Sequence, residues 1–154
     1  MATKMTAQKL PYPIEDTIWP TATTIGQETK DLLALFYTLA DDAGPDAGPR
    51  MVKDVFSSHG TMRAATGVYE GAEAISDSRA NAWTQVSIRR HTIQRVYVHD
   101  DMAQDLMALG TAEMMLRNGD RRVSRFAARL VINAESHVAK QPRLDLMEVF
   151  PAPS

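Results

Sequence analysis

The sequence contains no cysteine. This absence excludes disulfides, thiolate catalysis, and zinc or iron–sulfur centres held by cysteine ligands. It does not indicate a compartment, because a chain without cysteine fits either an oxidising or a reducing environment.

Long apolar runs and an excess of positive charge are also missing. No stretch approaches the roughly 18 consecutive apolar residues of a membrane span, and the first residues, MATKMTAQKLPYP, lack the apolar segment of a secretory signal. The formal charge is −2, and the arginines are scattered among acids, so the chain has no basic field that would bind a phosphate backbone. We therefore expect a cytoplasmic protein that binds neither membranes nor nucleic acid.

Motifs for phosphates and metals are absent as well. The glycine-rich stretch GPDAGPR lacks the Gly-Lys-Ser/Thr ending of a P-loop. His91 and His99 share one predicted strand, but eight residues at about 3.3 Å each separate them by about 26 Å. No predicted helix carries a His-x-x-x-His or Glu-x-x-His pair. We expect no metal and no other cofactor.

The length of 154 residues suits one domain with a substantial core. Residues 1–20 are polar and contain three of the prolines, Pro11, Pro13 and Pro20. They predict an extended N-terminal arm that lies on the surface or across a partner subunit. Residues 21–154 then form the single domain.

Helical spacing of apolar residues dominates the first half of this domain. A capping-box pattern, Thr24-x-x-Gln27, predicts the start of a first helix, which ends at Asp41 and Asp42. Pro49 suits the first position of a short second helix over MVKDVF. A third helix, about four turns long, is predicted over residues 72–86.

The period changes towards that of strands from residue 88 onwards, after an earlier strand or hairpin at residues 61–71. Asn118-Gly119 between two apolar runs is a strong hairpin signal. The order of helices followed by antiparallel strands predicts an α+β fold, with helices packed on one face of a curved sheet. The later predicted strands are residues 88–98, 103–117, 121–135 and 143–150.

His91 is the best candidate for a functional polar group, because Ile93, Val96 and Val98 tie its strand to the core. A buried imidazole needs a hydrogen-bond partner, and its ordinary pKa of about 6.5 allows proton transfer at neutral pH. The residue could be catalytic or could be a core histidine with a satisfied hydrogen bond. His99, beside two carboxylates in a turn, is interpreted as a solvated residue.

Three further side chains are candidates for catalysis. Glu113 lies in an otherwise apolar strand and is either an inward base or orienting group, or an outward solvated or interface residue. Tyr37 could direct its hydroxyl into a cavity between helix and sheet, or could be an ordinary core residue. His59 is either a weaker second acid or only a turn residue. Asp41 is interpreted as a loop acid.

Substrate contacts are expected from Phe36, Arg63, Tyr69 and Trp83. Small residues in the predicted strands suggest that the inner face of the sheet leaves room for a helix or a ligand. They are Ala108, Gly110, Ala112 and Ala128.

The order of elements, together with the segments LFYTLADD, VYEGAEAI and RRHTIQRVYV, resembles the nuclear-transport-factor-2-like (NTF2-like), SnoaL-like superfamily over about residues 22–150. The resemblance implies a cone-shaped α+β barrel, in which a bent antiparallel sheet wraps around N-terminal helices and leaves a deep pocket. It also implies dimers formed through the sheet. The superfamily includes polyketide cyclases, ketosteroid isomerases, scytalone dehydratase, limonene epoxide hydrolase and many proteins with no assigned activity, so the fold alone does not assign an activity.

The scytalone dehydratase pattern matches this sequence only in part. His91 matches a histidine in a similar strand, and Tyr37 loosely matches the tyrosine of a tyrosine–aspartate pair. Thr38 follows Tyr37 where the pattern has aspartate, and the next strand has Thr111 or Glu113 where the pattern has a second histidine.

We therefore expect a cofactor-independent enzyme that acts on a small apolar, polyketide- or terpenoid-like metabolite of secondary metabolism. The expected reactions are dehydration, isomerisation or cyclisation by general acid–base chemistry, with His91, Tyr37, Glu113 and His59 as catalytic residues. The alternative is a non-catalytic NTF2-like homodimer that binds a ligand or a protein.

Overall fold

The computed structural model describes residues 11–153, so half of the expected N-terminal arm, residues 1–10, lies outside the described residues. The helices of this part are η1 (Tyr12–Ile14), α1 (Gln27–Ala40), α2 (Ala47–Asp54), α3 (Gly71–Asn81) and α4 (Ala134–Val138). The strands are β1 (Phe56–Ala64), β2 (Gly67–Glu70), β3 (Val86–Val98), β4 (Asp105–Leu116), β5 (Arg121–Ile132) and β6 (Leu144–Pro151).

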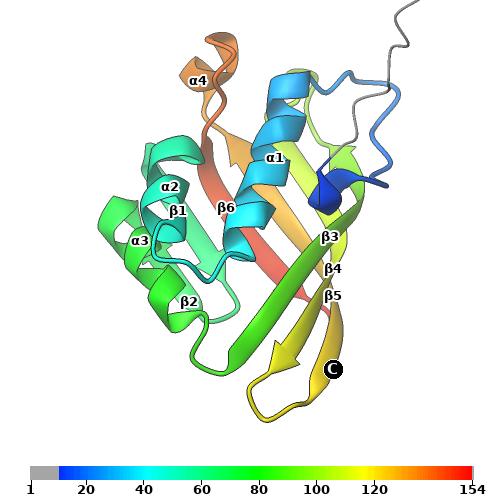
Figure 1. Ribbon diagram of the computed structural model, residues 1–154. Helices are drawn as coiled ribbons and strands as arrows, with labels where there is room; N and C mark the ends of the chain where they lie inside the picture. Colours follow the sequence, from blue (N-terminus) through cyan, green and yellow to red (C-terminus); the bar gives the residue numbers. More distant parts are fainter. Residues whose placement is uncertain (1–10, 154) are drawn as a thin grey trace, which may run out of the picture.

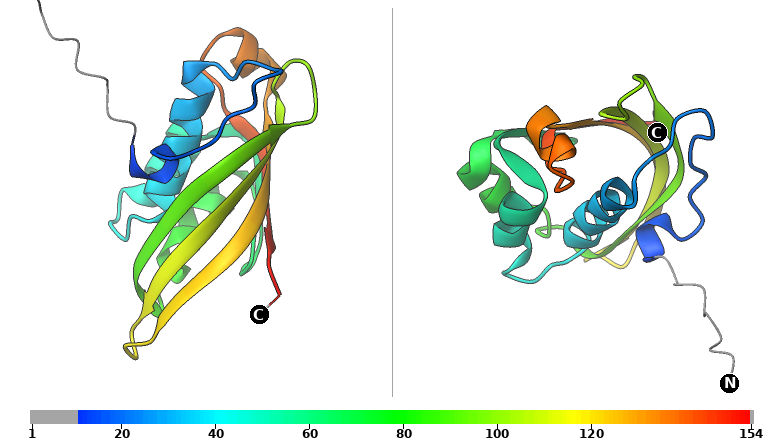
Figure 2. Two further views of the ribbon diagram at one scale, coloured as in Figure 1. Left: turned by 90° about the vertical axis from the view of Figure 1, so that its right-hand side faces the viewer. Right: turned by 90° about the horizontal axis from the view of Figure 1, so that it is seen from above.

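The six strands form one curved sheet in the order β2-β1-β6-β5-β4-β3. All neighbouring strands are antiparallel except β1 and β6, which are parallel. The sheet is not closed, because β2 and β3 are its two edges. It bends around α1, while α2 and α3 cover the end formed by β1 and β2 (Figures 1 and 2). The α+β prediction is confirmed, with an open sheet rather than a closed barrel.

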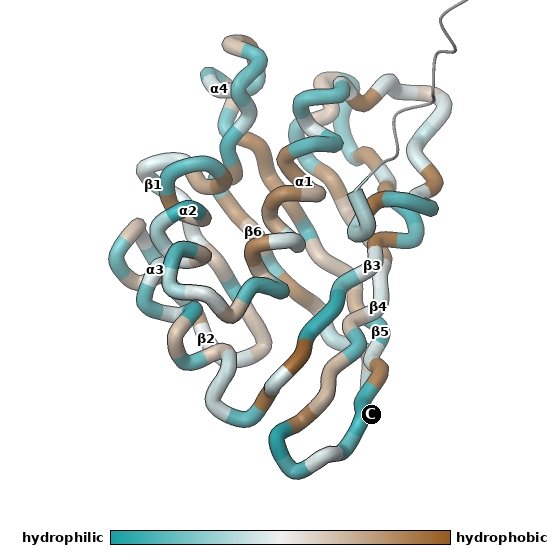
Figure 3. Tube along the Cα trace, viewed as in Figure 1, coloured by the Kyte–Doolittle hydropathy of each residue, from teal (hydrophilic) through white to brown (hydrophobic). Residues whose placement is uncertain are grey.

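The core lies between α1 and the inner face of the sheet. Figure 3 shows hydrophobic residues along α1 and on β6 behind it, and hydrophilic residues at the turn between β4 and β5. Leu33 and Leu39 of α1 are fully buried, as are Ile93 of β3 and Leu130 of β5. Burying such side chains stabilises the fold by about 1.5–3 kcal/mol each.

Three helices differ from the sequence prediction in their boundaries. The third ends at Asn81, and Val86, which was predicted to belong to it, starts β3. Gly26, with no side-chain hydrogen bond, is the N-cap of α1, so the predicted Thr24 capping box is wrong. The second helix starts before Pro49 and ends at Asp54, and Phe56 already belongs to β1. The apolar pair Val55 and Phe56 fits a strand as well as a helix, because a short apolar run has no distinguishing period.

The hairpin predicted at Asn118-Gly119 is confirmed. Gly119 has a φ of +94°, a conformation that glycine adopts without the steric cost of a Cβ atom. The Asn118 side-chain oxygen accepts a hydrogen bond of 2.9 Å from the Asp120 amide. β4 and β5 then pair without a register shift from Met115↔Arg121 to Asp105↔Val131, so alternate residues face the inner side of the sheet.

Residues 11–20 lie against α1 and the free edge of β3. The Ile18 amide donates to the Gln94 carbonyl, and the Ile18 carbonyl accepts from the Val96 amide. The Thr17 hydroxyl donates to the Ile93 carbonyl at 2.6 Å. These contacts pair an edge that would otherwise expose backbone groups. Among residues 11–153, no helix has both the length and the apolar character needed to cross a membrane.

Candidate active site

A cavity of about 220 Å³ lies between α1, the end of α3 and the inner face of the sheet. Its walls are mostly apolar, with Phe126 of β5 and Met147 of β6 among the lining residues. Ala112 and Ala128 leave space where larger side chains would fill it, which agrees with the room predicted from small residues. Gly110 provides no such space, because the ring of Phe126 packs against it. An apolar cavity with few polar groups suits a small-molecule ligand.

His91 is the central polar residue of this cavity. It lies on β3 opposite Ala112 of β4, and its side chain is 17% exposed. Its Nδ1 atom lies 2.5 Å from Oδ1 of Asp41, and its backbone amide donates to Oδ2 of the same carboxylate at 2.7 Å. β3 is an edge strand, so this amide is free to bind a side chain instead of a neighbouring strand.

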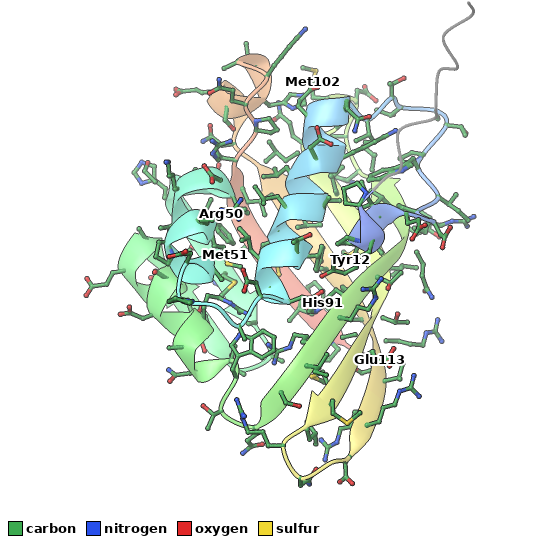
Figure 4. The ribbon with its side chains drawn as sticks, viewed as in Figure 1. Tyr12, Arg50, Met51, His91, Met102 and Glu113 are labelled. Atoms are coloured by element: carbon green, nitrogen blue, oxygen red, sulfur yellow. The ribbon has the colours of Figure 1, made fainter. Side chains whose placement is uncertain are left out.

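Asp41 is the C-cap residue of α1, and its side chain is only 5% exposed. A buried carboxylate at the negative end of a helix dipole is unfavourable unless hydrogen bonds compensate it. The His91 amide, His91 Nδ1 and the Tyr12 hydroxyl, 2.5 Å from Oδ2, supply this compensation. Figure 4 shows Tyr12 and His91 close to the C-terminal end of α1. We call these three residues the Tyr12–Asp41–His91 cluster.

The cluster defines the hydrogen-bonding roles of the imidazole. An ionised carboxylate only accepts hydrogen bonds, so Nδ1 of His91 carries the proton. The hydrogen bonds of His91 within residues 11–153 use its backbone amide and Nδ1, and not the other ring nitrogen, Nε2. In a neutral imidazole this nitrogen is the acceptor. His91 can therefore take a proton through Nε2 while Asp41 stabilises the resulting positive charge.

Tyr12 completes the cluster from the N-terminal segment. Burial, together with its hydrogen bond to Asp41 and the Asp41 charge, raises the pKa of the Tyr12 hydroxyl above its ordinary value. The hydroxyl therefore stays protonated and donates at neutral pH. The Arg90 guanidinium lies 4.0 Å from the centre of the Tyr12 ring, which holds the ring in place by a cation–π contact.

Tyr37 contributes a second polar group to the cavity wall. Its ring centre lies 5.2 Å from that of His91 and 5.9 Å from that of Phe126. The Tyr37 hydroxyl is buried and has no hydrogen-bond partner among the described residues. Burial, followed by the Asp41 charge, raises the pKa of this hydroxyl. Tyr37 lines the cavity, and a protonated hydroxyl without a partner among the described residues is a candidate donor to a bound molecule.

Three arginines also line the cavity, of which Arg125 is exposed, and Arg79 and Arg89 are partly buried. Arg79 of α3 donates from Nη2 to the Ala40 carbonyl at 2.9 Å, and Arg89 of β3 donates from Nη2 to the Ala82 carbonyl at 2.9 Å. The Arg89 guanidinium lies 4.8 Å from the centre of the Trp83 ring. Burial lowers the pKa of both arginines, that of Arg79 to about 10. Both remain positively charged at neutral pH.

The structure brings three of the sequence-predicted site residues together. His91, Tyr37 and Phe36 all line the cavity. Trp83 is buried beside Arg89 but does not line the cavity. Arg63 and Tyr69 are also not among the lining residues. Arg63 is exposed, and the Tyr69 hydroxyl hydrogen-bonds the Thr66 hydroxyl at 2.9 Å.

Glu113 and His59 lie outside the cavity. Glu113, labelled in Figure 4, faces the outer side of the sheet. Its carboxylate accepts a 2.9 Å hydrogen bond from Nε of Arg121. This hydrogen bond and the Arg121 charge lower the pKa of the carboxyl group. His59 is exposed on β1. The two residues therefore have no contact with a molecule bound in the cavity, and the outward alternative applies to Glu113.

Asp41, Tyr12, Arg79 and Arg89 are the site residues that sequence reasoning missed. A helix end is a common place for a solvated carboxylate, so the sequence favours a loop acid at Asp41. Its motif, Tyr37-Thr38-Leu39-Ala40-Asp41, nevertheless places the acid one helical turn after Tyr37. That spacing puts both side chains on one face of α1, and it is the signal that could have found Asp41.

Comparison of the sequence with protein-family models and with curated proteins finds no match. Solved structures nevertheless show similarity. An NTF2-like protein of unknown function from Exiguobacterium sp. 255-15 has 13% identity and a TM-score of 0.63, over 80% of this chain and 99% of that one. A type 2 hexachlorocyclohexane dehydrochlorinase has 11% identity and a TM-score of 0.66, over 82% of this chain and 84% of that one.

A third similar structure contains a bound small molecule. It is a protein with a ketosteroid isomerase-like fold from Catenulispora acidiphila, in complex with trimethylamine. It has 15% identity and a TM-score of 0.61, over 78% of this chain and 84% of that one. These similarities show that the chain has the NTF2-like fold, as the sequence resemblance predicted. At such identities they extend to the fold alone.

Proposed function

We propose that this protein is an enzyme that moves protons on a small, largely apolar molecule without a cofactor. The observation that carries the proposal is the 2.5 Å contact between Nδ1 of His91 and Oδ1 of Asp41 at the wall of a 220 Å³ cavity. A histidine oriented by a buried carboxylate is well suited to general-base catalysis.

Each polar group has a distinct role in this proposal. Nε2 of His91 removes a proton from the bound molecule, and Asp41 stabilises the imidazolium that forms. Tyr12 holds the Asp41 carboxylate in position. The Tyr37 hydroxyl donates a hydrogen bond to an oxygen of the substrate on which negative charge develops. The apolar wall excludes water and so strengthens these interactions.

Proton abstraction followed by loss of a hydroxyl group as water is a dehydration, and return of the proton at another atom is an isomerisation. Attack of the resulting carbanion on a carbonyl carbon of the same molecule, whose oxygen then takes a proton, is a cyclisation. The dehydrochlorinase among the similar structures is named for an elimination, which supports this class of reaction for the fold. Of the catalytic residues expected from the sequence, His91 and Tyr37 remain in the proposal, while Glu113 and His59 do not.

A hydrogen-exchange assay tests the proposal and needs no identified substrate. A panel of small apolar ketones is incubated with the protein in D₂O, and deuterium incorporation beside the carbonyl is measured by NMR. We expect exchange with at least one ketone, and a decrease of about 10²–10⁴-fold in His91→Gln. The matched control is His59→Gln, which changes an exposed histidine outside the cavity. Equal exchange by the wild-type protein and His91→Gln would contradict the proposal.

The outer face of the sheet supports a second proposal, a homodimer formed through this face. Ile88 of β3 is 62% exposed, Val123 of β5 is 57% exposed and Phe150 of β6 is 45% exposed. A set of large apolar side chains on the solvent side of three strands is typical of an interaction surface. Sedimentation of the wild-type protein at micromolar concentration tests it, with Val123→Glu expected to shift a dimer to a monomer. A monomeric wild-type protein would contradict the dimer.

A further inference from the structure

Arg79 and Arg89 give the cavity a charge that the general-base mechanism does not use. Both residues line the cavity, one from α3 and the other from β3. Within residues 11–153, neither arginine forms a salt bridge with an acidic side chain. Their observed hydrogen bonds go instead to the backbone carbonyls of Ala40 and Ala82.

Each guanidinium has more donors than these contacts satisfy. Arginine has five N–H groups in a fixed plane, and each of the two side chains donates one observed hydrogen bond. The Nε atom of Arg79 is buried and has no partner in the described part of the chain. Buried donors in proteins are normally paired, so an unpaired one beside a ligand-sized cavity indicates a missing acceptor.

The charges around the cavity are also unbalanced, in favour of positive charge. Burial, followed by the Arg89 charge, lowers the pKa of Arg79 to about 10, while the Asp41 charge opposes this change. Asp41 is the carboxylate whose charge acts on the pKa of both arginines. Its oxygens, however, already accept hydrogen bonds from Tyr12 and His91. Two partly buried cations therefore share a cavity without a carboxylate of their own.

We infer that the molecule bound in this cavity is an anion with an apolar body, and that Arg79 and Arg89 bind its carboxylate. The inference rests on the proposed function and specifies its substrate class. Guanidinium groups bind carboxylates through strong, charge-assisted hydrogen bonds. The apolar body of the ligand lies against Phe126, Ala112 and Ala128, within reach of His91. A carboxylate on the substrate thus orients the carbon that loses its proton.

A matched pair of probes separates charge from apolar contact. 2-Naphthoate and 2-naphthamide share a flat apolar body, but only the first carries a negative charge. Isothermal titration calorimetry measures the Kd of each for the wild-type protein. We expect the carboxylate to bind at least about tenfold more tightly than the amide, which corresponds to one hydrogen bond to a charged group.

Variants then assign the preference to the two arginines. Arg89→Met keeps an apolar side chain beside Trp83 and should weaken naphthoate about tenfold, with less than a twofold change for naphthamide. Arg79→Met also removes the hydrogen bond to the Ala40 carbonyl. A loss of folded protein would change both Kd values equally and leave their ratio unchanged, so the ratio is the readout for this variant. Arg95→Met is the control, because Arg95 is an exposed arginine on β3 outside the cavity.

Equal affinity for the two probes in the wild-type protein would overturn the inference, as would no measurable binding of naphthoate. A preference that Arg95→Met reduces as much as Arg89→Met would also overturn it, because the effect would then come from overall charge. The proposed function fails separately, through unchanged hydrogen exchange in His91→Gln. The binding experiment does not depend on turnover, so the two failures are distinguishable.

Discussion

The Nδ1 atom of His91 lies 2.5 Å from Oδ1 of Asp41, although the two residues are 50 positions apart in the sequence. The same carboxylate also accepts a hydrogen bond from the backbone amide of His91. These two contacts to one carboxylate join the end of α1 to β3 and orient the imidazole. The end of α1 and the edge strand β3 therefore form the site together.

Asp41→Asn should decrease proton-transfer activity by about 10²-fold or more, because an amide cannot stabilise an imidazolium and can favour the wrong tautomer. The deuterium-exchange assay measures this decrease. Asp42→Asn is the matched control, since Asp42 is the adjacent exposed acid and its side chain accepts a hydrogen bond from the Gly44 amide. Equal losses in the two variants would contradict a specific role for Asp41.

When the imidazole of His91 is neutral, it should carry its proton at Nδ1 and none at Nε2. Nitrogen-15 NMR at a pH above the ordinary histidine range distinguishes the two tautomers by the chemical shifts of the ring nitrogens. The wild-type protein should show the Nδ1–H form, and Asp41→Asn should lose this preference. An Nε2–H form in the wild-type protein would contradict the assigned role of Nε2 as the base.

Tyr12→Phe should destabilise the protein by about 1.5–3 kcal/mol, the usual contribution of a hydrogen bond to a charged group. It should also shift the nitrogen-15 signals of His91, because Asp41 loses one of its donors. Urea unfolding and NMR measure the two effects. Tyr97→Phe is the control, because Tyr97 is 48% exposed on the outer face. A stability loss with unchanged His91 signals would mean that Tyr12 acts only in packing.

Tyr37→Phe should decrease activity without decreasing stability. The buried hydroxyl has no partner in the described part of the chain, so its removal should leave the free energy of unfolding unchanged or raise it by up to about 1–3 kcal/mol. If the hydroxyl donates to the substrate, exchange should slow by about 10²–10³-fold. Urea unfolding and the exchange assay test the pair of outcomes. A variant with full activity would exclude Tyr37 from the mechanism.

Acid should weaken a contact on the outer face of the sheet. Arg129 donates to both oxygens of Asp105 at 3.0 and 2.9 Å, and this hydrogen bonding lowers the pKa of Asp105 below 3.8. A carboxyl group with a lowered folded-state pKa contributes stability above its unfolded value and loses it as the pH falls through the folded value. Arg129→Gln should therefore be less stable than wild type at neutral pH, with a smaller difference near pH 3. Urea unfolding at both pH values measures this, and a difference that grows in acid would contradict it.

Some features of the molecule follow from short-range patterns. The Asn118-Gly119 turn and the long strands on either side of it could be predicted, because glycine tolerates a positive φ and alternate residues face opposite sides of a strand. The inward position of His91 followed from the same alternation, since Ile93 marks the core face of its strand. The α+β class followed from the order of helical and strand periods.

Other features could not be predicted, because a polar residue in an apolar strand can face either the cavity or the solvent. Glu113 and His91 are both polar residues in apolar strands, and only the register of β3, β4 and β5 decides which faces the cavity. A shift of one residue reverses every side chain of a strand. The parallel pairing of β1 with β6 is likewise not encoded in either strand alone.

The sequence by itself determined the fold class, the main hairpin and the choice of His91 as a polar residue at the core, because these depend on neighbouring residues and on strand and helix periods. Only the tertiary structure decided that Asp41 binds this histidine, that Tyr12 donates to Asp41, and that Arg79 and Arg89 share the cavity. These groups come from separate elements, which meet only when α1 packs into the curved sheet and residues 11–20 pair with the edge of β3. Hydrogen bonds and charge contacts act over a few ångströms. The number of residues between two groups in the sequence does not show whether the groups lie that close in space.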